Sequence, residues 1–341
     1  MALFELIPRD SFFANQDVHD LNLHREKILL AMIGPILFGL TVKLKHEVTK
    51  DFGSINDILL RQLARSYRDN DGDCGACFEY AVHSAIRNNN PLVMERIQYA
   101  LSLCGIKGNK TTSFLLGFEK AGILQISNEL NNNLTPDSKL ITNLYGESIA
   151  IKEYINAMIN SFRKQSFRGA LPTTIQGIWK ADLFIGNTDS DMWVAASVKI
   201  NRLDLKYSRG LCLGIVPATW NKEPACSSKG GMIVCPLLYS KSFMELFYSS
   251  WQIVTKFLKN DAKLPKEMEL YHPVERKVAK YLASMRDRPV FELVDNDLRQ
   301  LAHPTIVELK ATKIETVDFL DKSIRRASNM TIFVPNSLRL Q

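Results

Sequence analysis

Apolar residues recur at helical spacing in several stretches of the chain. Between residues 151 and 162 they stand at i, i+3, i+4, i+7, i+8 and i+11, which places them along one face of a helix. These residues are Ile151, Tyr154, Ile155, Met158, Ile159 and Phe162. Similar stripes predict helices around residues 77–86 and over residues 91–103 and 242–258. Each of these helices is expected to bury one face.

A continuous apolar run covers residues 28–42, between Lys27 and Lys43, and contains the pair Gly34-Pro35. The run is shorter than the roughly 20 residues that a membrane-spanning helix requires. Proline removes a backbone donor and clashes with the preceding turn, so it bends or ends a helix. We therefore expect two short buried helices that meet at the proline, and no association with a membrane.

Alternation replaces helical spacing in the centre of the chain, over residues 175–201. Two segments rich in β-branched and aromatic residues flank the sequence Asn-Thr-Asp-Ser-Asp, which predicts a β-hairpin with a longer loop. Two more apolar runs, residues 210–218 and 231–238, are bounded by turn residues and predict further buried strands.

The hairpin carries the most suggestive polar residues of the chain. Alternation along its second strand places Ser197 and Lys199 on one face. Asp182, on the first strand, can lie opposite them, so that a carboxylate, a hydroxyl and an ammonium converge. Because an unpaired buried charge is costly, a lysine in mid-strand needs such a partner. The simpler alternative is an ordinary cross-strand ion pair on the surface.

This spacing resembles the PD-(D/E)xK nuclease superfamily, in which an aspartate on one strand is followed by an acid-x-Lys triplet on the next. There the acids hold a divalent metal, and the lysine positions or activates the attacking water. By this resemblance Asp182 corresponds to the aspartate and Lys199 to the lysine. Ser197 stands where the second acid is expected, and Ala181 stands where the family often has proline. The resemblance covers roughly the central 60 to 100 residues.

A helical glutamate is the candidate for the missing acid, because in that family a glutamate on the helix before the core strands often completes the metal site. Glu79 lies at the margin of the apolar stripe around residues 77–86, so its carboxylate can point into a neighbouring cleft. Glu153, on the helix directly before the hairpin, is the rival. Its neighbours on the helix are mostly solvent-facing by the pattern of apolar positions, and we favour Glu79. A boundary glutamate held by water or by an arginine is the structural alternative.

Composition and net charge indicate the class of partner but do not identify a function. The 341 residues are 46% hydrophobic and 23% charged, as in ordinary globular proteins, and suit one large domain or two. The net charge of +7 favours a polyanionic partner. Arg202, Lys206 and Arg209 follow Lys199 closely and are candidates for contacts to the DNA backbone. A solvated basic loop is the alternative.

The cysteines do not form a recognisable framework. Six are scattered through the chain without a preceding secretory signal, which favours a reducing compartment, and we expect a cytoplasmic protein. Cys74 and Cys77 form a close pair, but no second pair or Cys/His cluster completes a tetrahedral zinc site. The acidic residues 69–73 lack the spacing of a calcium loop and predict a turn that enters a helix.

Three regions are expected along the chain. Residues 1–145 form a mostly helical N-terminal region that supplies Glu79 and includes a linking segment, 105–146, with a short helix near 114–120. Residues 146–260 form the core, and residues 261–341 form a helical extension. The expected fold class is α/β, with a restriction-endonuclease-like mixed sheet flanked by helices.

The resemblance implies a Mg²⁺-dependent DNA endonuclease, with a role in restriction or in defence against phage. Asp182 and Glu79 would bind Mg²⁺, and Lys199 would act with them in catalysis. Should Glu79 be structural, the acid would come from Glu153 or Asp204. Because of Ser197, the competing hypothesis is a non-catalytic DNA-binding or scaffold subunit with a degenerate nuclease core. Other subunits or a second copy of the chain are further expected partners.

Overall fold

The structure is a computed structural model that describes the following residues: 11–69, 71–115, 132–156, 181–205, 210–218, 227–229, 231–237, 243–270, 272–298, 314–317 and 332–335. The N-terminal part contains α1 (Ser11–Lys43), α2 (Lys45–Phe52), α3 (Leu60–Ser66), α4 (Asp71–Arg87) and α5 (Pro91–Leu103). After the sheet come α9 (Phe243–Lys259), α10 (Pro273–Ser284), α11 (Val290–Glu292) and a π-helix (Leu293–Leu298). The helices predicted over residues 91–103 and 242–258 are therefore confirmed. The helix expected after the acidic residues 69–73 is also present, but it begins within them, at Asp71.

Helix α1 corrects the prediction of two short helices that meet at a proline. It is a single helix with Pro35 in its interior. Around the proline, Ile33, Ile36 and Leu37 are fully buried in the main core. Each buried aliphatic side chain contributes about 1.5–3 kcal/mol, so together they outweigh the roughly 3 kcal/mol that an internal proline costs.

Helix α1 contains the apolar run that was compared with a membrane-spanning helix. Among the described residues, no single helix is both long and apolar enough to cross a membrane. One bent pair, Arg25–Lys43 with Lys45–Phe52, reaches that length and composition only when its two helices are taken together.

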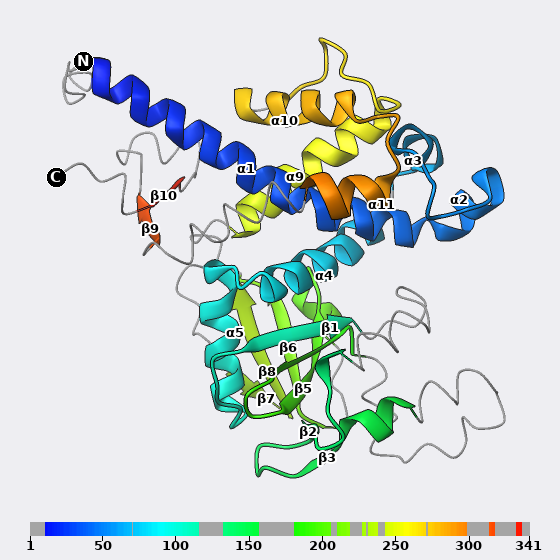
Figure 1. Ribbon diagram of the computed structural model, residues 1–341. Coiled ribbons are helices and arrows are strands. Elements are labelled where there is room, and N and C mark those ends of the chain that lie inside the picture. The colour runs from blue at the N-terminus through cyan, green and yellow to red at the C-terminus, as the bar shows by residue number, and fades with distance from the viewer. Residues whose placement is uncertain are drawn as a thin grey trace.

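A mixed sheet lies below the helices α1, α9, α10 and α11, and α4 runs between this helical layer and the sheet (Figure 1). Its strands are β1 (Thr111–Leu115), β2 (Lys139–Ile141), β3 (Ser148–Ala150), β4 (Leu183–Asn187), β5 (Met192–Val198), β6 (Cys212–Pro217), β7 (Ser227–Lys229) and β8 (Met232–Leu237). The order is β1-β4-β5-β6-β8-β7, and β2 joins β5 on one side and β3 on the other. The pairs β5–β6, β6–β8 and β2–β5 are parallel, and the other pairs are antiparallel.

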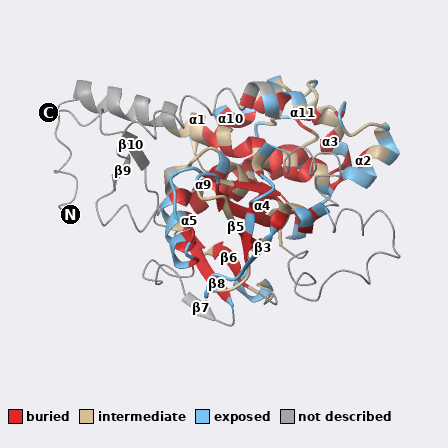
Figure 2. Cartoon of the chain, turned by 60° about the horizontal axis from the view of Figure 1, so that its bottom comes forward, coloured by how far each residue is buried: buried red, intermediate tan, exposed pale blue. Residues whose placement is uncertain are grey.

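The two faces of β5 alternate as the sequence predicted. Val194 and Ala196 belong to the main hydrophobic core, which the sheet shares with α1, α4 and α9. Trp193 and Ala195 belong to a second core on the opposite face. Both faces of β5 are therefore covered, and Figure 2 shows the buried residues running through the strands and into the helical layer.

Strand β1 corrects the prediction of a short helix near residues 114–120. Residues 111–115 pair with β4 in antiparallel register, and the remainder of the predicted helix lies outside the described residues. Phe114 is fully buried, with its ring centroid 5.2 Å from those of Phe184 and Trp193. The sheet thus takes β1 and β2 from the part of the chain before residue 145. The division into three regions stays a prediction.

Candidate active site

The hairpin of β4 and β5 fixes the positions of Asp182 and Lys199. Asp182 directly precedes β4, and its backbone N–H donates to the Ala196 carbonyl at 2.9 Å. Lys199 directly follows β5, and its N–H donates to the Ile215 carbonyl of β6 at 3.0 Å. Each residue therefore lies just outside the strand on which it was predicted, yet the sheet ladder still holds its backbone.

One oxygen of the Asp182 carboxylate accepts three hydrogen bonds. Its Oδ2 accepts hydrogen bonds from the Lys199 Nζ at 2.8 Å, from the Val198 backbone N–H at 2.9 Å and from the Ser197 hydroxyl at 3.2 Å. The predicted convergence of carboxylate, hydroxyl and ammonium is thus present. Because all three donors come from the adjacent end of β5, the aspartate is held in one orientation.

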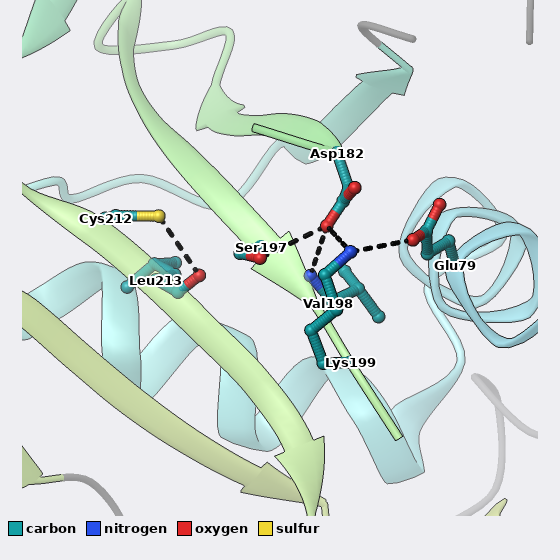
Figure 3. Close-up of polar contacts among 7 residues, drawn as sticks. All are labelled: Glu79, Asp182, Ser197, Val198, Lys199, Cys212 and Leu213. Atoms are coloured by element: carbon teal, nitrogen blue, oxygen red, sulfur yellow. Dashed lines mark hydrogen bonds and ion pairs between the residues drawn. The ribbon is translucent and has the colours of Figure 1, made fainter. Parts of the chain in front are cut away.

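Glu79 completes the cluster from α4. The Lys199 ammonium donates to Glu79 Oε1 at 3.0 Å while it contacts Asp182, so it bridges two carboxylates (Figure 3). The Glu79 and Asp182 side chains are only 7% and 11% exposed, and that of Lys199 is 29% exposed. The pair is therefore not the exposed surface ion pair of the simpler alternative.

Glu153, the rival candidate for the second acid, differs from Glu79 in its exposure. It is exposed to solvent on the helical residues 151–156, as the pattern of apolar positions predicted. Asp204 is also exposed. Of the three candidates for the second acid, Glu79 is the one whose carboxylate contacts Lys199.

The packing of α4 explains why Glu79 lies there. The predicted apolar stripe of α4 is buried, with Phe78 packed edge-on against Phe247 of α9 at 5.2 Å between ring centroids. One turn beyond Glu79, His83 Nδ1 and the Ser113 hydroxyl of β1 are 3.0 Å apart in a hydrogen bond. Burial lowers the pKa of His83 to about 3, so its imidazole is neutral at pH 7. This link between α4 and β1 fixes the helix that carries Glu79, and no sequence motif pointed to it.

The cluster has a formal charge of −1, since one ammonium is shared by two carboxylates. Within the described residues, no group of three or more His, Cys, Asp or Glu side chains forms a metal site. Mg²⁺ is commonly held by one or two protein carboxylates, with water and substrate oxygens as its other ligands. Glu79 and Asp182 meet that minimum, and they would hold the ion by displacing the ammonium from between them. Their residual negative charge fits a cation.

The remaining predicted site residues are less informative. Arg202 is exposed and lies in a 3₁₀ turn, Arg202–Asp204, just after Lys199. Lys206 and Arg209 lie outside the described residues. Cys74 and Cys77 form no disulfide, and burial raises the pKa of the Cys77 thiol well above its usual value.

Comparisons with protein-family models, with curated proteins and with solved structures found no match to this chain. The geometry of the Glu79–Asp182–Lys199 cluster is therefore the main indication of what this chain does.

Proposed function

We propose that this protein is a Mg²⁺-dependent endonuclease that cleaves DNA in the manner of the PD-(D/E)xK nucleases. The observation that carries the proposal is the meeting of Glu79 and Asp182 at the Lys199 ammonium. The resemblance associates a helical glutamate, a strand aspartate and a strand lysine with one site. In this chain they come from three separated segments, α4 and the facing ends of β4 and β5.

The place of the cluster in the sheet supports the proposal. Lys199 follows the carboxyl end of β5, and β6 runs parallel beside it. In open α/β sheets, ligands bind in the crevice beyond the carboxyl ends of the parallel strands. The polar cluster therefore lies where a substrate can approach without disrupting the buried faces of the sheet.

Charge also favours a phosphodiester substrate. The cluster carries −1, a bound Mg²⁺ would bring it to +1, and one bridging phosphodiester would neutralise it. A low-dielectric site stabilises such a balanced set far better than one with excess charge of either sign. The proposed ion and substrate would thus neutralise the summed formal charge of the three side chains.

Each residue has a distinct role in the proposed reaction. Glu79 and Asp182 would hold Mg²⁺, which polarises the phosphate and lowers the pKa of a bound water. Lys199 has a flexible four-carbon stem, so its ammonium can leave the bridge and orient the attacking water or stabilise charge on the phosphate. The Ser197 hydroxyl, which already donates to Asp182, orients that carboxylate.

A second candidate function is a non-catalytic DNA-binding or scaffold subunit. It is favoured by Ser197 in the place of an acid and by the Lys199 bridge, which satisfies both carboxylates without a metal. A role in restriction or anti-phage defence, and assembly with other subunits or as a homodimer, are further proposals that follow from the resemblance alone.

A nuclease assay separates the two functions. Plasmid and linear DNA are incubated with the wild type, Glu79→Gln, Asp182→Asn and Lys199→Met, with and without Mg²⁺, and Glu153→Gln serves as the control because Glu153 is exposed. We expect Mg²⁺-dependent cleavage by the wild type and the control, and a loss of about 100-fold or more in the other three variants. A wild type that binds DNA but does not cleave it would favour the scaffold. Equal cleavage by all variants would overturn the proposed site.

A further inference from the structure

A short turn next to the cluster holds one leucine out in solvent. Leu203 is 90% exposed, although it is a large apolar residue in a well-tied turn. The Asn201 side chain accepts a hydrogen bond from the Leu203 N–H at 3.0 Å, and the Asp204 N–H donates to the Asn201 carbonyl at 3.0 Å. These hydrogen bonds fix the turn in a conformation that leaves the Leu203 side chain exposed.

The turn is anchored to the sheet at both ends. Before it, the Lys199 N–H donates to β6. After it, Leu205 packs over Gly214 so closely that a Cβ on this glycine would lie 2.9 Å from Leu205 Cδ1. Gly214 pairs with Ser197, the residue that donates to Asp182. Leu203 thus projects from a segment that lies against the catalytic cluster.

The chain length bounds the distance between Leu203 and the cluster. Leu203 lies four positions after Lys199, so their Cα atoms are at most about 14 Å apart. Duplex DNA rises about 3.4 Å per base pair. Because the two side chains extend this span to about 23 Å at most, Leu203 can reach bases within about seven steps of a phosphate that is bound at the Lys199 ammonium.

We propose that Leu203 is a wedge that inserts between base steps of duplex DNA beside the scissile phosphate. The inference rests on the proposed function and adds to it the substrate class, which is a duplex that is locally unstacked when bound. Proteins that bend DNA use apolar side chains in this way, with cationic residues next to them on the phosphates. Arg202 supplies the adjacent cation, and Asp204 on the other side disfavours a position of Leu203 along the phosphates themselves.

A second copy of the chain is the other partner that an exposed leucine can bind. Stable interfaces bury about 800 Å² on each partner, which is far more than one side chain supplies. The residues beside Leu203 in the sequence, from Asn201 to Asp204, are exposed and polar or charged. The immediate surroundings therefore resemble a contact to nucleic acid more than the apolar centre of a protein interface.

Fluorescence of 2-aminopurine tests the wedge. The probe base is placed at successive positions within about seven steps of the mapped cleavage position, or along the whole duplex if the protein does not cleave. Binding is measured with Ca²⁺ in place of Mg²⁺. We expect the wild type to raise the emission at least about twofold, because unstacking relieves quenching. Leu203→Ala should abolish the rise while Kd changes by less than about tenfold, because the phosphate contacts remain. Leu103→Ala, at an exposed leucine at the end of α5, is the matched control.

The outcomes separate the wedge from the nuclease proposal. Cleavage by the wild type with no rise at any probe position, or with the same rise in Leu203→Ala, would overturn the wedge and leave the nuclease intact. A rise that depends on Leu203 in a protein that never cleaves would support the wedge and overturn the nuclease. Absence of DNA binding overturns both. A dimer that Leu203→Ala dissociates would assign the leucine to a second copy of the chain.

Discussion

Removal of the Lys199 ammonium is the perturbation that most directly tests the cluster. Lys199→Met keeps most of the volume of the side chain but leaves two nearly buried carboxylates facing each other. Loss of one partner from a fully buried ion pair costs about 3–5 kcal/mol, whereas exposed pairs contribute about 0–1 kcal/mol. Because Lys199 is partly exposed, we expect the free energy of unfolding to fall by about 2–4 kcal/mol.

Divalent cation should reverse this loss. In Lys199→Met the two carboxylates no longer have to release an ammonium, so Mg²⁺ can take its place directly. At a concentration 100 times its Kd, a ligand that binds the folded state adds about 2.7 kcal/mol of stability. Mg²⁺ should therefore restore most of the stability of the variant and should stabilise the wild type less.

Urea denaturation, followed by circular dichroism with and without Mg²⁺, measures both effects. Lys259→Met is the matched control, because Lys259 pairs with Asp69 at 2.7 Å on the exposed surface, and its loss should cost at most about 1 kcal/mol. The reasoning is refuted if Lys199→Met loses no more stability than this control. It is also refuted if Mg²⁺ stabilises the variant no more than the wild type.

Two more predictions concern the elements that position the cluster. The folded-state pKa of His83, about 3, lies below its ordinary 6.5, so the folded protein should lose up to about 5 kcal/mol as pH falls from 6.5 towards 3. His83→Gln should flatten this dependence in urea titrations across pH, and the exposed His46→Gln should not; equal slopes would contradict the assignment. A Cβ at Gly186 would lie 2.6 Å from the Trp193 ring, so Gly186→Ala should destabilise by about 1–3 kcal/mol. Gly75→Ala, with open space around it in α4, should add up to about 1 kcal/mol, and thermal melts that reverse this order would refute the packing argument.

The hairpin could be predicted because its signals are local. Alternation over residues 183–198 fixes which side chains share a face, and the antiparallel pairing places Asp182 opposite the end of the second strand. The burial of Glu79 followed in part from its position beside the stripe of α4. Its contact with Lys199 did not, because no periodicity relates two residues so distant in the sequence.

The two wrong predictions share a physical cause. Local preference disfavours a proline such as Pro35 inside a helix, and it is ambiguous for a short apolar run such as the segment around Phe114. In the fold, burial of the apolar face of α1 outweighs the cost of the proline. Pairing with β4 makes the residues around Phe114 a strand. Tertiary contacts decided both elements, and the local sequence does not contain them.

The serine at position 197 explains how such a cluster can be stable without metal. Ser197 is only 8% exposed, so a carboxylate there would have given a nearly buried cluster with a formal charge of −2. Excess buried charge is strongly destabilising in a site of low dielectric. With serine the charge is −1, and the Lys199 bridge satisfies both remaining acids. By the resemblance to the PD-(D/E)xK nucleases, the serine also stands in place of one expected ligand, so cation binding should be weaker than at a site with three carboxylates. In the proposed nuclease, Glu79 and Asp182 would hold Mg²⁺ with a substrate phosphate as a further ligand, while Lys199 satisfies both acids when no ion is bound.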